Sequence, residues 1–135
     1  MKQLLFALMI AVPGFAAAQA HAQATPAGKW VAEEIGGSRV GGGQQTTLEL
    51  TDDGRALGSG GCNRYRGTAE FDATSITFTP LASTKMACEA AVMEQETRFH
   101  KAVEQVKSWR IDGATHKLSL LDGNGAVLAR FARTE

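Results

Sequence analysis

Two cysteines, Cys62 and Cys88, constrain the fold of this chain more than any other feature. Cys62 stands in a glycine-rich stretch, residues 60–67, and Cys88 stands at the start of an amphipathic segment. In an oxidising compartment, two cysteines most economically form one bridge. We therefore predict a disulfide between Cys62 and Cys88 that ties a β-turn region to the start of a helix. The alternative is a reactive thiol at Cys88, but the chain has no Cys-x-x-Cys pair to support it.

Residues 1–24 have the pattern of a cleavable secretory signal peptide. Lys2 gives a basic start, an apolar run follows over residues 4–12, and the small-x-small patterns at 18–20 and 22–24 both fit a cleavage site. The apolar run is too short for a comfortable membrane span. Because no cysteine lies near the cleavage region, we expect no lipid anchor. We predict a mature domain over residues 25–135 that is exported to the periplasm.

The predicted mature part, about 110 residues, has the usual size of one domain with its own core. The whole chain has 14 basic and 14 acidic side chains, so it is close to neutral. This balance gives no electrostatic reason to expect nucleic acid or an anionic membrane as a partner. We expect a monomer without a cofactor.

Eight short segments have the composition and alternation of β-strands. They cover residues 29–35, 46–51, 55–58, 68–72, 75–79, 108–112, 117–121 and 126–131. Residues 52–54 and 122–125 supply the turns of two hairpins. Residues 38–45, with three consecutive glycines, predict a mobile loop without regular structure.

One amphipathic helix is predicted, beginning at Cys88. Its apolar stripe contains Cys88, Val92, Phe99, Val103 and Val106. Because Cys88 belongs to this stripe, we expect its side chain to point inward, toward the sheet. Ser83 and Thr84, just upstream, are candidate N-caps. One helix against so many strands favours an α+β fold. We expect a strongly curved antiparallel sheet, a partial barrel of about eight short strands, with the helix packed on it.

The polar residues that follow Cys62 are the first candidates for a binding site. Asn63, Arg64 and Tyr65 are framed by Gly61 and Gly67, which permit backbone conformations that other residues resist. A turn that exposes them would bind an anion or a peptide. The alternative is a tight β-bulge in which the asparagine satisfies free backbone groups. The glycines do not match a phosphate-binding loop.

Glu96 lies at the edge of the predicted apolar stripe, where a carboxylate needs a partner. We predict a structural ion pair with Arg64, because the disulfide draws the two regions together. Glu96 and His100 are spaced like a pair of metal ligands, but no third ligand follows, so we expect no metal site. Nothing in the chain matches a nucleophile motif, and we expect no enzymatic activity.

Two segments carry a family resemblance. Residues 61–67 read Gly-Cys-Asn-Arg-Tyr-x-Gly, and residues 81–88 read Leu-Ala-Ser-Thr-Lys-Met-Ala-Cys. With Met93-x-x-Glu96-x-x-Phe99 and Trp30, they resemble the META domain (HslJ-like) family over nearly the whole mature chain. The second segment adds Thr84 and Met86 to the candidate motif residues.

The resemblance implies a small α+β domain that is exported or attached to the envelope. Bacterial members are linked to heat shock, to stress response and to novobiocin resistance, and no catalytic activity is implied. We therefore expect a non-enzymatic envelope accessory protein that binds a protein or peptide partner. The alternative is a carrier of a small apolar ligand, because a curved sheet with a helix can enclose a cavity.

Overall fold

A computed structural model describes residues 10–14 and 24–134 of the chain. Most of the predicted signal peptide, residues 1–9 and 15–23, therefore lies outside the described residues. The described part contains ten strands and one helix. They are β1 (Gly28–Ile35), β2 (Ser38–Arg39), β3 (Thr47–Leu50), β4 (Arg55–Ser59), β5 (Arg64–Phe71), β6 (Ile76–Phe78), β7 (Ala82–Ser83), α1 (Ala90–Gln105), β8 (Ser108–Ile111), β9 (Leu118–Leu121) and β10 (Val127–Arg133).

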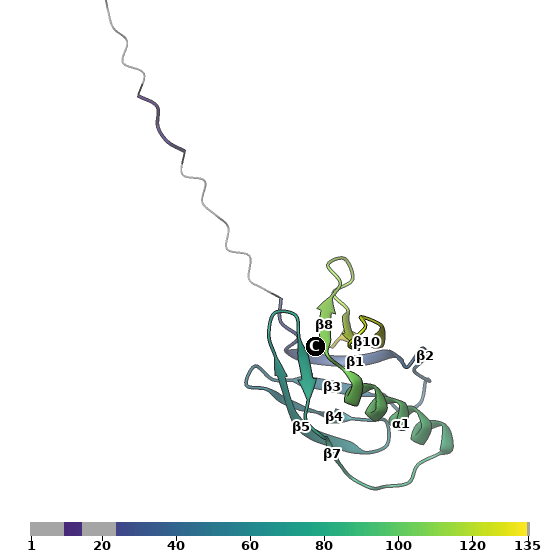
Figure 1. Ribbon diagram of the computed structural model, residues 1–135. Coiled ribbons are helices and arrows are strands. Elements are labelled where there is room, and N and C mark those ends of the chain that lie inside the picture. The colour runs from purple at the N-terminus through teal and green to yellow at the C-terminus, as the bar shows by residue number, and fades with distance from the viewer. Residues whose placement is uncertain (1–9, 15–23, 135) are drawn as a thin grey trace, which may run out of the picture.

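Eight of the strands form one antiparallel sheet in the order β6-β5-β4-β3-β1-β10-β9-β8, while β2 pairs with β1 and β7 pairs with β5. The two ends of the sheet meet, because Ser75 forms a bridge with Ser108 and the Ile76 N–H donates to the Lys107 carbonyl oxygen at 3.1 Å. The result is a nearly closed barrel with α1 lying across one side of it (Figure 1). The predicted α+β fold, a curved sheet with one helix, is confirmed.

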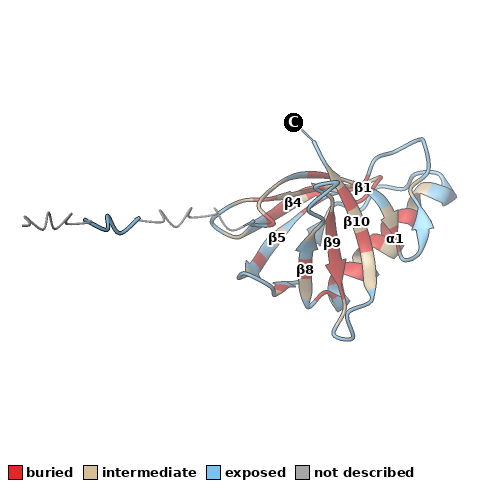
Figure 2. Cartoon of the chain, turned by 90° about the horizontal axis from the view of Figure 1, so that it is seen from above, coloured by how far each residue is buried: buried red, intermediate tan, exposed pale blue. Residues whose placement is uncertain are grey.

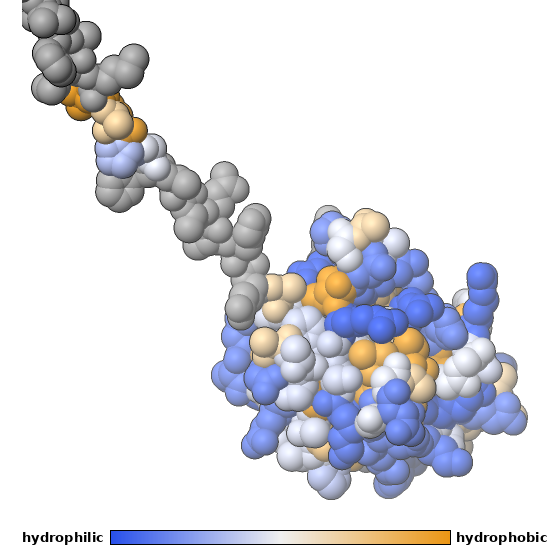
Figure 3. Space-filling view, turned by 45° about the horizontal axis from the view of Figure 1, so that its top comes forward, coloured by the Kyte–Doolittle hydropathy of each residue, from blue (hydrophilic) through white to orange (hydrophobic). Residues whose placement is uncertain are grey.

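Large apolar side chains fill the space between the sheet and the helix. Those that are almost fully buried include Trp30, Ile35, Leu48, Leu50, Ile76, Phe99, Leu118, Leu120 and Phe131. Phe99 belongs to α1, and the others come from strands, where they lie mostly at alternate positions, as a pleated sheet with one inner face requires. Figure 2 shows buried positions along β9, β10 and α1. On the face in Figure 3, hydrophilic side chains separate small apolar areas.

The helix begins later than predicted, at Ala90, two residues after Cys88. Cys88 is exposed and precedes the helix, so its predicted inward position is wrong. Ser83 lies in β7 and Thr84 follows it directly, so neither caps the helix; the N-cap residue is Glu89, which makes no side-chain capping bond. Residues 88–91 are exposed, and apolar periodicity alone does not reveal where the contact between the helix and the sheet begins.

The buried face of α1 differs from the predicted stripe. It contains Gln95, Glu96, Phe99, Ala102 and Val103. Val106, also predicted, is buried just after the helix ends. Two polar residues therefore face the barrel. Among the described residues, no helix is long and apolar enough to cross a membrane.

The predicted loop over residues 38–45 begins with regular structure. Ser38 and Arg39 form β2 and pair with Ile35 and Glu34 of β1. Gly36 and Gly37 make this possible, because both have positive φ values, 57° and 81°. Two such residues form the tight hairpin turn whose twist matches that of the strands. Only the part after Arg39 remains without a strand until β3.

Candidate functional site

Glu96 of α1 anchors the turn that precedes β5. Its side chain is 6% exposed. One carboxylate oxygen, Oε2, accepts hydrogen bonds from the backbone N–H groups of Cys62 and Asn63, each at 2.7 Å. The other, Oε1, accepts from the Nδ2 of Asn63 at 2.9 Å. Hydrogen bonds to a carboxylate are stronger than those between neutral groups, so this contact fixes the turn against the helix.

These bonds also set the charge of Glu96. Burial raises the pKa of its carboxyl, but hydrogen bonds from Asn63 and Cys62 outweigh burial, and the net pKa lies below the ordinary value of 4.5. Glu96 is therefore an ionised acceptor at neutral pH. With both oxygens already engaged, it has little capacity to act as a general base or a metal ligand.

Asn63 joins the turn and the helix to a third segment, residues 84–86. Its side chain is 3% exposed. The oxygen Oδ1 accepts from the Met86 N–H at 2.7 Å and from the Thr84 hydroxyl at 2.8 Å. Besides its bond to Glu96, Nδ2 donates to the Met86 carbonyl oxygen at 3.1 Å. We call this set, Cys62, Asn63, Thr84, Met86 and Glu96, the polar node.

The predicted disulfide joins two of the segments that the polar node joins. Cys62 and Cys88 are bonded, with their Cα atoms 6.0 Å apart. Cys62 belongs to the turn and Cys88 to the extended segment that leads into α1. The covalent bond and the hydrogen bonds therefore hold residues 84–88 at the same place.

Two glycines give the node its space. An added Cβ on Gly60 would lie 2.7 Å from the Cγ of Glu96. Gly61 has a φ of 134°, which side chains rarely adopt. The carbonyl oxygen of Gly60 also accepts a hydrogen bond from the Thr46 hydroxyl at 2.8 Å. The glycines thus allow the turn to approach Glu96 closely.

We expect Gly60→Ala to lower the free energy of unfolding by about 1–3 kcal/mol, because the new methyl group displaces the Glu96 side chain. Gly43→Ala is the matched control, since an added Cβ there meets no atom within 4 Å. Chemical denaturation of both variants measures the difference. Equal stability of the two would contradict the close approach.

The remaining candidates lie apart from the node. Tyr65 is buried in the core, where its hydroxyl donates to the Thr47 carbonyl oxygen, its ring centre lies 5.1 Å from that of Phe99, and burial raises its pKa. Gly67 makes room for Leu81, because an added Cβ would lie 2.7 Å from its Cδ2. Both residues therefore support the fold.

The predicted ion pair between Arg64 and Glu96 is wrong. Arg64 is exposed in β5, and none of the ion pairs found among the described residues joins it to Glu96. Residues 64–67 belong to β5 and continue its alternation, so Arg64 and Tyr65 point to opposite faces. Uncharged donors, the backbone amides and Asn63, occupy the carboxylate instead.

A groove of about 590 Å³ lies between α1 and the segment that contains β7. We call it the helix groove. It is lined by Asn63, Leu81, Ser83, Thr84, Lys85, Met86, Met93, Glu96, Thr97, His100, Lys101 and Glu104. Four predicted motif residues, Asn63, Thr84, Met86 and Glu96, are therefore brought together here. A second cavity of about 380 Å³ shares Leu81, His100 and Glu104 with it.

His100 and Glu104 are the titratable residues that line both cavities. The Nε2 of His100 is buried without a hydrogen-bond partner among the described residues. Burial lowers the pKa of the imidazole, against the opposing charges of Glu96 and Glu104. Lys85 and Lys101 bring positive charge to the same groove. No cluster of three or more potential metal ligands is found in the part of the chain that the structure describes.

The family model of the META domain matches residues 22–135, which include the whole of the predicted mature chain. The chain belongs to the META domain family. Among solved structures, an NMR structure of a protein from Burkholderia xenovorans is similar, with 26% identity, a TM-score of 0.63, and coverage of 79% of this chain and 81% of that one.

A second NMR structure has 18% identity and a TM-score of 0.59, with coverage of 78% of this chain and 88% of that one, and it shows likeness of fold alone. A comparison with curated proteins found no significant match. The family thus rests on the domain match.

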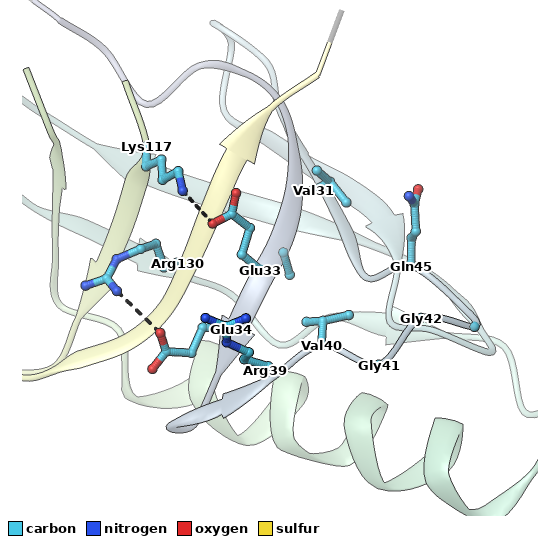
Figure 4. A pocket seen from close by; sticks show the side chains of 12 residues that line it. Val31, Glu33, Glu34, Arg39, Val40, Gly41, Gly42, Gln45, Lys117 and Arg130 are labelled. Atoms are coloured by element: carbon cyan, nitrogen blue, oxygen red, sulfur yellow. Dashed lines mark hydrogen bonds and ion pairs between the residues drawn. The ribbon is translucent and has the colours of Figure 1, made fainter. Parts of the chain in front are cut away.

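The META domain has another cavity, of about 620 Å³, on the outer side of β1. Figure 4 shows Glu33 directed at Lys117 and Glu34 at Arg130, with N–O distances of 2.8 and 3.3 Å. The charges of these four residues are paired within the cavity wall. Sequence reasoning did not find this cavity, because Glu34 and Arg130 become neighbours only through the register of β1 and β10.

Gln95 is a further residue of the META domain that sequence reasoning missed. It is 5% exposed. Its Nε2 donates to the Gln44 carbonyl oxygen and the Thr46 hydroxyl, and its Oε1 accepts from the Gly41 N–H. Gln95 thus fixes the loop of residues 41–46, which contains three consecutive glycines, to α1. The sequence did contain one indication of this role: Gln95 lies beside Glu96, at the edge of the predicted apolar stripe.

Proposed function

We propose that this META domain is a non-enzymatic, exported accessory protein that binds a protein or peptide partner in the helix groove. The observation that carries the proposal is a groove wall fixed by the polar node and the disulfide, from which an apolar side chain projects. A wall that is fixed before binding loses little conformational entropy when a partner docks.

The projecting side chain is Met86. It is 58% exposed, while the other two large hydrophobic residues found exposed, Ile10 and Val12, lie in the N-terminal segment. Both backbone groups of Met86 are held by the Asn63 side chain. A flexible thioether on a fixed backbone adapts to many apolar surfaces. Leu81 and Met93 line the same groove and extend the apolar contact.

The polar groups of the groove support a binding role. Glu96 and Asn63, its two most buried polar side chains, are occupied by structural hydrogen bonds. Because these polar atoms are already hydrogen-bonded, they are poorly placed to transfer a proton, which requires a free group within reach of a substrate. The disulfide and the predicted signal peptide support export.

The cavities favour a peptide over the alternative of an apolar ligand. Large side chains such as Trp30, Phe99 and Phe131 fill the space that such a ligand would need. The helix groove and the cavity in Figure 4 are surface features lined in part by charged side chains. An apolar carrier needs an enclosed site with a predominantly apolar lining.

Site-specific photocrosslinking in living cells tests the proposal. A benzophenone side chain at Met86 should give discrete adducts with one partner protein. The same side chain at Asn124, in the exposed β9–β10 turn, is the control and should not give these adducts. Absence of adducts at Met86, or the same pattern at both positions, would count against partner binding in this groove.

A further inference from the structure

Within residues 10–14 and 24–134, β7 pairs with β5 on one side, and no strand pairs with its outer edge. In the antiparallel pair with β5, the Thr84 N–H donates to the Arg64 carbonyl oxygen at 3.1 Å, and Ser83 lies opposite Tyr65. Residues along an antiparallel strand direct their N–H and C=O groups alternately toward and away from the partner strand. Because Thr84 faces β5, the backbone N–H and C=O of Ser83 face away from it.

The free edge of β7 borders the helix groove. Leu81, Ser83 and Lys85 line one wall, and Thr97, His100 and Lys101 of α1 line the other. A strand edge that borders an open groove is a template for an extended peptide, which adds to the sheet as a further strand. The bonds of β7 to β5 and of Met86 to Asn63 keep this edge in place.

The charges around this edge are mostly positive. Lys85 and Lys101 line the helix groove, and Arg64 and Arg66 line the cavity of about 410 Å³ on the other side of β7. The acidic residues of the two cavities are Glu96 and Glu104. Glu96 keeps its charge, but its carboxylate is buried and already accepts three hydrogen bonds from the polar node, and Glu104 also lines the adjoining cavity of about 380 Å³. The four basic side chains still outnumber the two acidic ones. In a nearly neutral chain this edge is a local basic surface.

We infer that the occupant of the helix groove is an extended acidic peptide segment that pairs its backbone with Ser83 of β7 as an added strand. This inference rests on the proposed function and specifies its binding mode. The backbone bonds supply affinity without sequence preference, while the lysines and Met86 select acidic and apolar side chains at alternate positions.

Binding of a synthetic probe to the full chain in its oxidised form tests the inference. The probe is a short fluorescein-labelled peptide of alternating Glu and Val, and its affinity is measured by fluorescence anisotropy. A peptide with Lys in place of Glu should bind at least about tenfold more weakly. Two further versions carry N-methyl groups on the amides of one edge or the other. Methylation of the edge that pairs with β7 should abolish binding.

Variants of the protein test whether the peptide contacts Ser83 and the two lysines. Ser83→Pro removes the N–H that faces the groove but no bond to β5, so binding should weaken about tenfold or more. Ser83→Ala is the control, since it keeps the N–H and should bind like the natural chain. The double change Lys85→Glu and Lys101→Glu should reverse the preference in favour of the lysine peptide. Thermal melting shows whether each variant is folded.

Other outcomes would overturn the inference. If the acidic peptide binds in the groove and neither methylated version is weakened, strand addition is wrong, while peptide binding stands. If no probe binds but Met86 still crosslinks to one partner, the acidic specificity is wrong and the proposed function stands. If the protein forms a dimer that Ser83→Pro dissociates, the β7 edge belongs to a second copy of the chain.

Discussion

Replacement of Glu96 by alanine should lower the free energy of unfolding by about 3–5 kcal/mol. The change leaves the N–H groups of Cys62 and Asn63 buried without an acceptor, and it removes the bond from Asn63 Nδ2. The cost of an unsatisfied buried donor is larger than the net value of an ordinary hydrogen bond. Equilibrium unfolding in urea measures the loss.

Two comparisons make the Glu96 experiment specific. Glu94→Ala, on the exposed face of the same helix, should change stability by less than about 0.5 kcal/mol. Glu96→Gln keeps one acceptor oxygen but directs an NH₂ group toward Asn63 Nδ2, or forces Asn63 to flip away from Met86. It should therefore be clearly destabilised despite its similar shape. A glutamine variant as stable as the natural chain would contradict the assigned role.

Glu96 also gives stability a defined pH dependence. Its folded pKa lies below the ordinary value of 4.5, so the folded state binds fewer protons than the unfolded state as the pH falls. The stabilisation is complete above the ordinary value and is lost progressively as the pH falls from there through the lowered folded pKa. Glu96→Ala should lose this contribution to acid sensitivity.

Removal of the disulfide is the second change with a large expected effect. The bond joins residues 26 apart in the chain. The chain-entropy model gives about 3.5 kcal/mol for a loop of this size. The double variant Cys62→Ser and Cys88→Ser should be less stable by about this amount, and its abundance in the cell should fall accordingly.

Reduction provides the control for the disulfide experiment. Dithiothreitol should lower the melting temperature of the natural chain toward that of the double-serine variant, and it should leave the variant unchanged. An equal melting temperature of the oxidised natural chain and the variant would show that the bond contributes nothing to stability. Because the polar node remains in the variant, the helix groove should persist in its folded fraction.

Most of the fold follows from local patterns. Hairpins such as β3–β4 and β9–β10 were predictable because alternation and turn residues occur together within a few positions. The start of α1 was not, because the exposed segment around Cys88 continues the helical periodicity without helical structure. The β1–β2 hairpin was missed because its two-residue strand is too short for alternation to show.

The residues of the site were easier to predict from the sequence than the contacts between them. Asn63, Thr84, Met86 and Glu96 were candidates and do meet at one groove. Charge complementarity suggested Arg64 as the partner of Glu96, but the start of β5 turns its side chain outward. Backbone amides took its place, and backbone donors leave no signal in the residue types.

Glu96 fixes the turn before β5, and with it the wall of the helix groove. Amide hydrogen exchange at Cys62 and Asn63, followed by NMR, tests this role most directly. We expect both amides to exchange slowly in the natural chain, as slowly as those of the central strand β1, and to exchange fast in the folded Glu96→Ala variant. Fast exchange of these two amides in the natural chain would contradict it.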